Sequence, residues 1–173
     1  METSTTTKWA VDAAHSELQF KVKHLVISTV TGSFKSFSGE INGSDDNFEG
    51  ASVEITVDIN SIDTNQADRD NHLKSDDFFA AATYPTMHFS GHVTGDKLAG
   101  DLTVRGTTNK VIFDLDFNGI ANDPWGNTKA GFELNGKINR KDFGLTWNAI
   151  TEAGGMLVSE DIKIVGNIQL AKA

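Results

Sequence analysis

The chain has 173 residues, no cysteine and a formal net charge of −9 at pH 7. Its length fits one domain, and the lack of cysteine excludes disulfides, thiol nucleophiles and cysteine-ligated zinc. An acidic chain without a run of Lys or Arg argues against nucleic acid as a partner. No apolar stretch approaches the roughly 20 residues that cross a bilayer, and residues 1–7 lack the basic and apolar parts of a signal peptide. We therefore expect a cytoplasmic protein that does not span a membrane, or a periplasmic one if a leader has been removed.

The first part of the chain predicts a short tail and two strands. Residues 1–8 are polar and rich in threonine, so we expect a disordered tail ahead of a single domain spanning residues 9–171. From Leu18 onward, apolar residues alternate with charged and amide residues, which is typical of a half-buried antiparallel strand. Another strand follows, in which Phe34 and Phe37 have opposite parity. Either one of them points outward or a bulge separates them.

A short polar helix then interrupts the strand pattern. Residues 53–59 alternate as a strand, and residues 66–75 predict a helix with Thr64 or Asn65 as its cap and acidic residues in its first turn. Leu73 is the only strongly apolar residue in this helix. A helix with so little apolar surface cannot be a core element, so it must lie on another part of the fold.

The second half of the chain repeats the two-residue alternation, in residues 87–93, 98–104, 111–117, 132–138 and 162–170. With turn signals between them, eight to ten strands and one helix predict an all-β domain, either a closed antiparallel barrel or a sandwich. Four glycines fall on the apolar face of these strands. They either relieve the bending of a barrel or leave room for a ligand, and they are Gly91, Gly100, Gly136 and Gly166.

Known catalytic motifs are missing from the sequence. It contains no Gly-x-Ser-x-Gly elbow, phosphate-binding loop, dinucleotide fingerprint or His-Glu-x-x-His. His88 and His92 lie about 13 Å apart if they share a strand, too far apart to bind one metal ion. We therefore predict no catalytic residue, no metal site and no cofactor.

The polar residues of the predicted helix have two interpretations. His72 and Asp76 are four residues apart and could pair on a helix as part of an acid–base cluster. Alternatively, Arg69 and Asp70 form charge-assisted hydrogen bonds that clamp the helix to the strands. The lack of a nucleophile or second motif beside the cluster favours the clamp.

Motifs along almost the whole chain, from Trp9 to Leu170, resemble one known family. They are Asp12-x-x-His15-Ser16, Phe20-x-Val22-x-His24, Val30-Thr31-Gly32-x-Phe34, Ser61-Ile62-x-Thr64, Arg69-Asp70-x-His72-Leu73, Asp77-Phe78-Phe79, Tyr84-Pro85-x-x-x-Phe89, Gly100-x-Leu102-Thr103-Val104-Arg105-Gly106-Thr107-Thr108 and Asn139-Arg140-x-Asp142-Phe143-Gly144-Leu145. In this order they resemble the YceI-like proteins, a family of lipocalin-like barrels associated with polyisoprenoid binding.

The resemblance implies an extended antiparallel β-barrel of eight strands, with one short helix between strands and a long apolar chain in its bore. A barrel of eight strands can enclose one slender ligand, and each methylene moved from water into the bore contributes about 0.8 kcal/mol. We therefore expect a carrier, storage or sequestering protein for a polyisoprenoid, quinone-like or fatty-acyl lipid, and not an enzyme. The resemblance also allows a homodimer.

The expected ligand-binding residues are inward-facing side chains of the strands, together with apolar residues near the helix that would close one end of the bore: Leu18, Phe20, Val22, Phe34, Val57, Leu73, Phe78, Phe79, Phe89, Leu102, Phe113, Phe132 and Ile164. The expected polar clamp consists of His15, His24, Arg69, Asp70 and His72. The alternative is an enzyme acting on an apolar isoprenoid-like substrate through His24, Arg69, Asp70 and His72, which would have to face the bore. A third interpretation, an interaction protein that uses the barrel as a scaffold, predicts an exposed apolar patch and no cavity.

Overall fold

The computed structural model describes residues 7–24, 28–43, 48–145 and 160–172. Its strands are β1 (Thr7–Val11), β2 (Glu17–His24), β3 (Ser28–Phe34), β4 (Phe37–Gly43), β5 (Ser52–Asp58), β6 (Ile62–Asp63), β7 (Thr86–Thr94), β8 (Lys97–Val104), β9 (Thr107–Asn122), β10 (Thr128–Asn139) and β11 (Asp161–Lys172). The α-helix is α1 (Ala67–Lys74), and three short 3-10 helices are η1 (Ala13–His15), η2 (Ile59–Ser61) and η3 (Arg140–Phe143). None of the helices in these ranges is long and apolar enough to cross a membrane.

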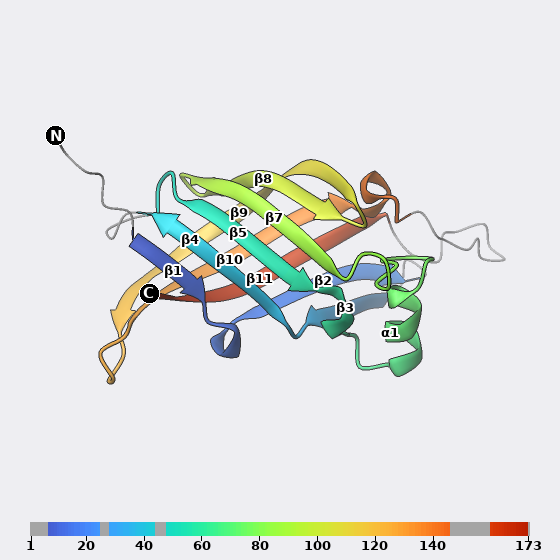
Figure 1. Cartoon of the computed structure of the whole chain (residues 1–173), viewed down its shortest axis with the longest axis horizontal. Helices are drawn as coiled ribbons and strands as arrows, with labels where there is room; N and C mark the ends of the chain where they lie inside the picture. The colour runs from blue at the N-terminus through green and yellow to red at the C-terminus, as the bar shows by residue number, and fades with distance from the viewer. Residues whose placement is uncertain (1–6, 25–27, 44–47, 146–159, 173) are drawn as a thin grey trace.

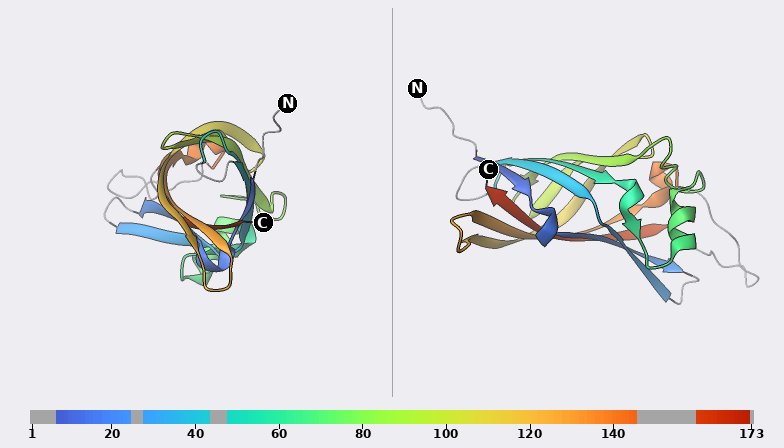
Figure 2. Two further views of the ribbon diagram at one scale, coloured as in Figure 1. Left: turned by 90° about the vertical axis from the view of Figure 1, so that its left-hand side faces the viewer. Right: turned by 60° about the horizontal axis from the view of Figure 1, so that its bottom comes forward.

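The strands form a closed antiparallel barrel (Figure 1; end-on in Figure 2). β1, β4, β5, β7, β8, β9, β10 and β11 are hydrogen-bonded in that order, and β1 also pairs with β11, which closes the ring. β2 pairs with β11 and β3, and β3 pairs with β6. Three of the barrel strands are interrupted, because each consists of two segments that follow one another along the chain. These segments are β1 with β2, β3 with β4, and β5 with β6. The result is the eight-stranded barrel, and not the sandwich.

The two-residue alternation of the sequence sets the inner and outer faces. In β7, Phe89 and Val93 are buried inside the barrel, whereas His88 and His92 are exposed. The opposite parity of Phe34 and Phe37 comes from a break in the strand between β3 and β4, which shifts the alternation. Both rings are therefore buried. Of the two alternatives, the interrupted strand is confirmed, and neither ring points outward.

Three of the four inward-facing glycines make room for neighbouring phenylalanine rings. A Cβ on Gly136 would lie 2.1 Å from Cδ1 of Phe113, and a Cβ on Gly91 or on Gly100 would lie within 2.9 Å of Cζ of Phe89. Gly91 and Gly100 also face each other across β7 and β8. An aromatic ring laid over a strand glycine restores the packing that the missing side chain would lose. The room at these positions is thus filled by the protein itself.

The N-terminal boundary differs from the expected one. Thr7 and Lys8 pair with Gly43 and Asn42 as part of β1, so the tail predicted for residues 1–8 ends before residue 7. Residues 1–6 lie outside the described residues. The polar, threonine-rich composition of residues 1–8 hid the start of β1, whose first two residues, Thr7 and Lys8, belong to that stretch.

The cap of α1 also differs from the expected one. The side chain of Gln66 accepts a hydrogen bond of 2.6 Å from the backbone N–H of Arg69, so Gln66 is the cap and the helix begins at Ala67. Neither Thr64 nor Asn65 caps it. Thr64 bonds to the side chain of Asp70 instead.

Candidate functional site

An apolar cavity runs along the inside of the barrel. The space between the lining atoms, including the part open to solvent, is about 1090 Å³, and a water-sized sphere can place its centre in about 140 Å³. By the latter measure a single water needs only about 10–15 Å³, so the cavity admits a chain of atoms, although a narrow one. It is lined by Leu18, Gln19, Phe34, Phe37, Ile41, Phe48, Val53, Ile55, Val57, Met87, His88, Phe89, Val93, Leu98, Leu102, Phe113, Leu115, Phe132, Leu134, Ile138, Ile164, Ile168 and Leu170.

The wall of this cavity consists of side chains that face inward and still keep accessible surface. The buried core falls into two clusters, one that includes Phe89 and one that includes Phe34. Ile55, Met87 and Ile164 pack against both clusters and are only partly buried. Inside a closed barrel, such exposure arises where a side chain borders empty space. The cavity therefore lies where the two clusters meet.

The chemistry of the lining is apolar. Gln19 and His88 are its only polar residues. The side chain of His88 lies on the outer face of β7, with Nε2 2.6 Å from Oε2 of Glu54 and Nδ1 3.1 Å from Oγ1 of Thr56, so His88 meets the cavity through its main chain. In the part of the chain that the structure describes, no group of three or more acidic or histidine side chains is placed to hold a metal ion. The cavity can bind an apolar chain, and it presents no acid–base pair.

Eight of the thirteen expected ligand-binding residues lie in the cavity lining, while the other five lie outside it. The eight are Leu18, Phe34, Val57, Phe89, Leu102, Phe113, Phe132 and Ile164. Their contact with a ligand stays a prediction. Phe20 and Val22 lie outside the lining. The ring of Phe20 is placed over Gly32, and Val22 pairs with Val30 further along.

α1 lies beside one end of the barrel (Figure 1). Leu73, Phe78 and Phe79, in this helix and just after it, belong to the apolar core or pack against it. Leu73 and Phe79 pack against both core clusters, and the ring of Phe79 meets Phe34 edge-on at 6.2 Å. Phe78 is buried, and its carbonyl accepts a hydrogen bond of 2.9 Å from Nη1 of Arg105. These side chains pack on the core without lining the cavity, and their closing of one end of the bore stays a prediction.

A polar clamp holds the start of α1, with Thr64 at its centre. Arg69 donates from Nε to Thr64 Oγ1 at 2.8 Å and from Nη2 to Thr64 O at 2.6 Å. Asp70 accepts from the backbone N–H and the hydroxyl of Thr64, at 2.8 and 2.5 Å. Since β6 ends at Asp63 and pairs with β3, these bonds fix the helix to the edge of the barrel. Arg69 and Asp70 thus make the charge-assisted hydrogen bonds that were expected, and their effect on stability stays a prediction.

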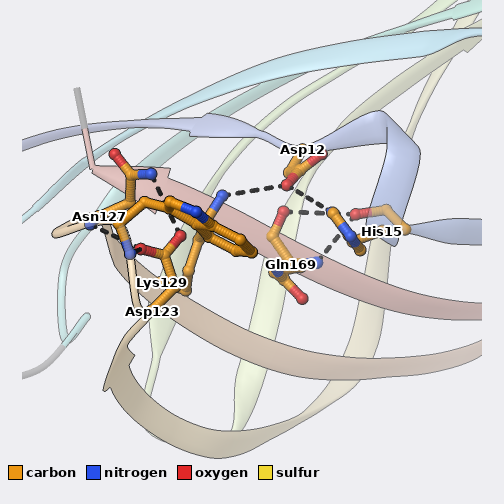
Figure 3. A network of polar contacts seen from close by, with 8 residues as sticks. Asp12, His15, Asp123, Asn127, Lys129 and Gln169 are labelled. Atoms are coloured by element: carbon orange, nitrogen blue, oxygen red, sulfur yellow. Dashed lines mark hydrogen bonds and ion pairs between the residues drawn. The ribbon is translucent and has the colours of Figure 1, made fainter.

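Two of the histidines expected in the clamp, His15 and His72, contact other residues. His72 pairs with Asp77 at 2.8 Å, and not with Asp76 as helical spacing predicted, because α1 ends at Lys74. His15 lies in η1, where Nδ1 is 2.9 Å from Oδ2 of Asp12 (Figure 3). Its place in the clamp is therefore a wrong prediction, because η1 belongs to a different part of the barrel. The side chain of His24 lies outside the described structure.

Asp12 joins the strands at η1. Its carboxylate also contacts Nζ of Lys129 at 3.1 Å (Figure 3). The hydrogen bond from His15, assisted by Lys129, holds the pKa of Asp12 below its ordinary value, although partial burial acts the other way. This ion pair links the first strand to β10.

Two structural residues carried no signal that pointed to their role. Phe48 lines the cavity from a short segment outside any alternating run, and its ring contacts those of Trp9, Phe117 and Phe132. Arg140 is 2% exposed and donates from Nη1 to the carbonyl of Leu145 at 2.5 Å. Burial lowers the pKa of Arg140, and Glu160 opposes that effect. A buried arginine can be predicted only when its partners are known.

Relatives of known sequence cover almost the whole chain. A UPF0312 protein of Staphylococcus epidermidis is 36% identical over 167 residues, which are 95% of this chain and 98% of that relative. A UPF0312 protein of Staphylococcus aureus is 37% identical over the same share of each chain.

Solved structures share the barrel. The YceI protein of Campylobacter jejuni is 34% identical, with a TM-score of 0.73 over 100% of this chain and 99% of that one. A polyisoprenoid binding domain from Saccharophagus degradans, implicated in plant cell wall breakdown, is 17% identical, with a TM-score of 0.73 over 95% and 98% of the two chains. That second likeness shows the fold alone. The model of the YceI-like domain matches residues 9–170, and the chain therefore belongs to the YceI-like family.

Proposed function

We propose that this protein binds a long apolar or amphiphilic lipid inside its barrel and serves as a carrier, store or sequestering protein for it. The observation that carries the proposal is the cavity, whose lining side chains are apolar apart from Gln19. A metabolite rich in polar groups would leave its hydrogen-bonding groups unpaired there, at a cost of about 1–3 kcal/mol each. A hydrocarbon chain would leave none.

The size of the hydrophobic contribution makes such binding feasible without polar contacts. Each buried methylene contributes about 0.8 kcal/mol, and loss of rotamer and overall freedom opposes part of it. A chain of ten or more carbons therefore retains a net gain. The narrow bore of an eight-stranded barrel favours a slender chain over a bulky ring system.

The comparisons make an isoprenoid the first lipid to test. The Saccharophagus degradans domain that shares this fold is described as polyisoprenoid-binding. Isoprenoid quinones and fatty-acyl lipids have the same slender apolar chain, so they belong to the proposed ligand class. Apolar walls discriminate between chains of similar girth by only about 1–3 kcal/mol per methylene.

The alternative of an enzyme requires acid–base groups beside the ligand. Arg69 and Asp70 bond to Thr64, and His72 pairs with Asp77, and none of these residues lines the cavity. The geometry of the described residues therefore favours binding over catalysis. The scaffold interpretation predicted no cavity, whereas the barrel contains one.

A homodimer accompanies the lipid site in this proposal. Ile112 on the outer face of β9 and Trp125 in the turn between β9 and β10 are exposed, and a second copy of the chain would cover such apolar surface. Sedimentation analysis tests this part separately, with a monomer at all concentrations as the result against it.

Native mass spectrometry of the purified protein, before and after organic extraction, tests the proposed function. We expect the extracted protein to take up geranylgeraniol, an isoprenoid alcohol of 20 carbons, in a 1:1 complex, and to release it unchanged in mass. Lack of a complex with both geranylgeraniol and a fatty acid of similar length would contradict lipid binding. A chemically altered alcohol would support the enzyme instead.

A further inference from the structure

The barrel wall is open between its first two interrupted strands. β1 pairs with β4 as far as Ala10 and Glu40, and β2 pairs with β3 from Gln19 and Ser33 onward. Between these points, residues 11–18 and 34–39 form no backbone hydrogen bond with each other. The cause is local, because η1 interrupts one strand and the break after Phe34 interrupts the other. We call this opening the seam.

Both edges of the seam are hydrogen-bonded to neighbouring segments of the barrel. On one side, the backbone N–H of Asp12 donates to the carbonyl of Gln169 at 2.8 Å, and Ser16 Oγ accepts from the backbone N–H of Gln169 at 2.9 Å. On the other side, the backbone N–H of Lys35 donates to the carbonyl of Ser61 at 3.1 Å. The seam is therefore a defined gap in the hydrogen-bond ladder and not a frayed strand.

A polar pocket lies in the seam and borders the apolar cavity. Its volume is about 440 Å³, measured as the space open to the centre of a water-sized sphere. Leu18, Gln19, Phe34 and Phe37 line both this pocket and the cavity. One layer of side chains therefore separates the two spaces. A ligand that occupied both would have a polar end in the seam and an apolar end in the bore.

The rim of the pocket offers hydrogen-bonding groups that the protein itself does not use. Glu17, Ser33, Lys35 and Asn167 belong to it, and in the described part of the chain none of their side chains has a hydrogen-bonding or ionic partner. By contrast, His15 on the same rim is engaged with Asp12 (Figure 3). The polar groups on one side of the pocket are thus hydrogen-bonded within the protein, whereas those on the other side can bond to a ligand.

The charges of the rim favour an uncharged head group. Lys35 and Glu17 offset each other, and the chain as a whole carries a net charge of −9. A diphosphate is typically bound by several cations or by backbone N–H groups at a helix start, and this rim contains one unpaired cation. Hydroxyl and amide groups such as those of Ser33 and Asn167 suit a hydroxyl or carbonyl oxygen.

We propose that the seam is the head-group site of the lipid and its point of entry. An uncharged oxygen-bearing head, a hydroxyl or a carbonyl, binds either Ser33 or Asn167 at the rim, while the tail passes Phe34 and Phe37 into the cavity. Entry from the side requires side chains of this layer to turn, whereas no backbone hydrogen bond has to break. This inference rests on the proposed lipid-binding function and adds the class of head group to it.

A comparison of head groups on one tail tests the inference. The probes are geranylgeraniol, its parent hydrocarbon and its diphosphate, titrated against the extracted protein. The seam variant is the double substitution Ser33→Ala with Asn167→Leu. The matched control is Ser52→Ala with Asn118→Leu, which removes the same groups at positions outside both pockets.

We expect the seam variant to bind the alcohol about tenfold more weakly than the wild type, since the hydrogen bond to the head group is lost. Its affinity for the hydrocarbon and all affinities of the control variant should stay within about twofold, and the wild type should bind the diphosphate more weakly than the alcohol. Equal affinity of wild type and seam variant for the alcohol, or preference for the diphosphate, would overturn the head-group site and leave lipid binding intact. Failure of the wild type to bind both the alcohol and the hydrocarbon would instead contradict the proposed function.

Discussion

The cavity wall and the segment around α1, residues 64–81, both contain phenylalanines and both looked functional, yet they differ in what their side chains still have available. In the segment, Arg69, Asp70 and His72 already have partners within the same stretch of chain. In the wall, side chains such as Ile55 and Leu134 face inward and remain partly exposed because nothing fills the space beside them. The difference teaches that available surface, and not the density of polar groups, marks the candidate site here.

The wall depends on close approach of strands, and a substitution at Gly91 tests this most severely. A Cβ at this position would lie 2.3 Å from the carbonyl oxygen of Ala99 and 2.9 Å from Cα of Gly100, both backbone atoms that cannot move aside alone. We expect Gly91→Val to lower the free energy of unfolding by about 2–4 kcal/mol through overpacking, measured by urea denaturation.

Gly131→Ala is the control for that substitution. A Cβ at Gly131 would meet only Cβ of Asn118, at an ordinary 3.6 Å, so we expect a change of less than about 1 kcal/mol. Similar stabilities of Gly91→Val and Gly131→Ala would mean that the packing of β7 on β8 is looser than described.

The α1 segment should respond to loss of the hydroxyl of Thr64. Thr64→Val keeps the shape of the side chain and leaves Arg69 Nε and Asp70 Oδ1 without this partner. Because Thr64 is buried, we expect the free energy of unfolding to fall by about 1–3 kcal/mol, again in urea. Thr94→Val, at an exposed position, should change it by less than about 0.5 kcal/mol. An unchanged stability in Thr64→Val would show that the clamp does not hold the helix.

The smallest expected effect concerns Asp12 at the edge of the seam. The hydrogen bond from His15 and the ion pair with Lys129 lower its pKa in the folded protein. A lowered folded-state pKa stabilises the fold above the unfolded-state pKa, and this stabilisation is lost as the pH falls through the folded-state value. Asp12→Asn should therefore remove part of the acid sensitivity of the wild type, by less than about 1 kcal/mol for a pair near the surface.

Urea denaturation of both proteins at pH 7 and at pH 3 measures that difference. Glu54, Asp123 and Glu160 also have lowered pKa values, so the comparison is the difference between variant and wild type and not the wild-type slope. The same loss of stability on acidification in both proteins would show that Asp12 contributes nothing.

The sequence predicted the strands and the lining better than it predicted the ends of elements. Period-two alternation placed Phe89, Phe113 and Phe132 on inner faces, and all three line the cavity. Alternation reports only a face, so it could not show that the ring of Phe20 lies over Gly32 and outside the lining. Closure into eight strands depends on the pairing of β1 with β11, which are separated by most of the chain.

The polar groups were harder to place because their partners depend on where elements end. His72 pairs with Asp77 only because the helix stops at Lys74. The seam was equally hidden, since a gap in a ladder arises from the register of two strand pairs and not from any local motif. Cellular compartment and oligomeric state stay predictions.

The central claim is that the lipid lies in the barrel cavity. The most direct test is to measure geranylgeraniol binding by a variant whose cavity is filled with larger side chains. Ile55→Phe with Leu134→Phe adds bulk at two lining positions that border empty space, whereas Ile112→Phe adds a ring on the outer face of β9. If the lipid lies in the cavity, isothermal titration should show at least a tenfold loss of affinity, about 1.4 kcal/mol, for the inner variant and none for the outer one. Equal affinities of a well-folded inner variant and the wild type would contradict the account.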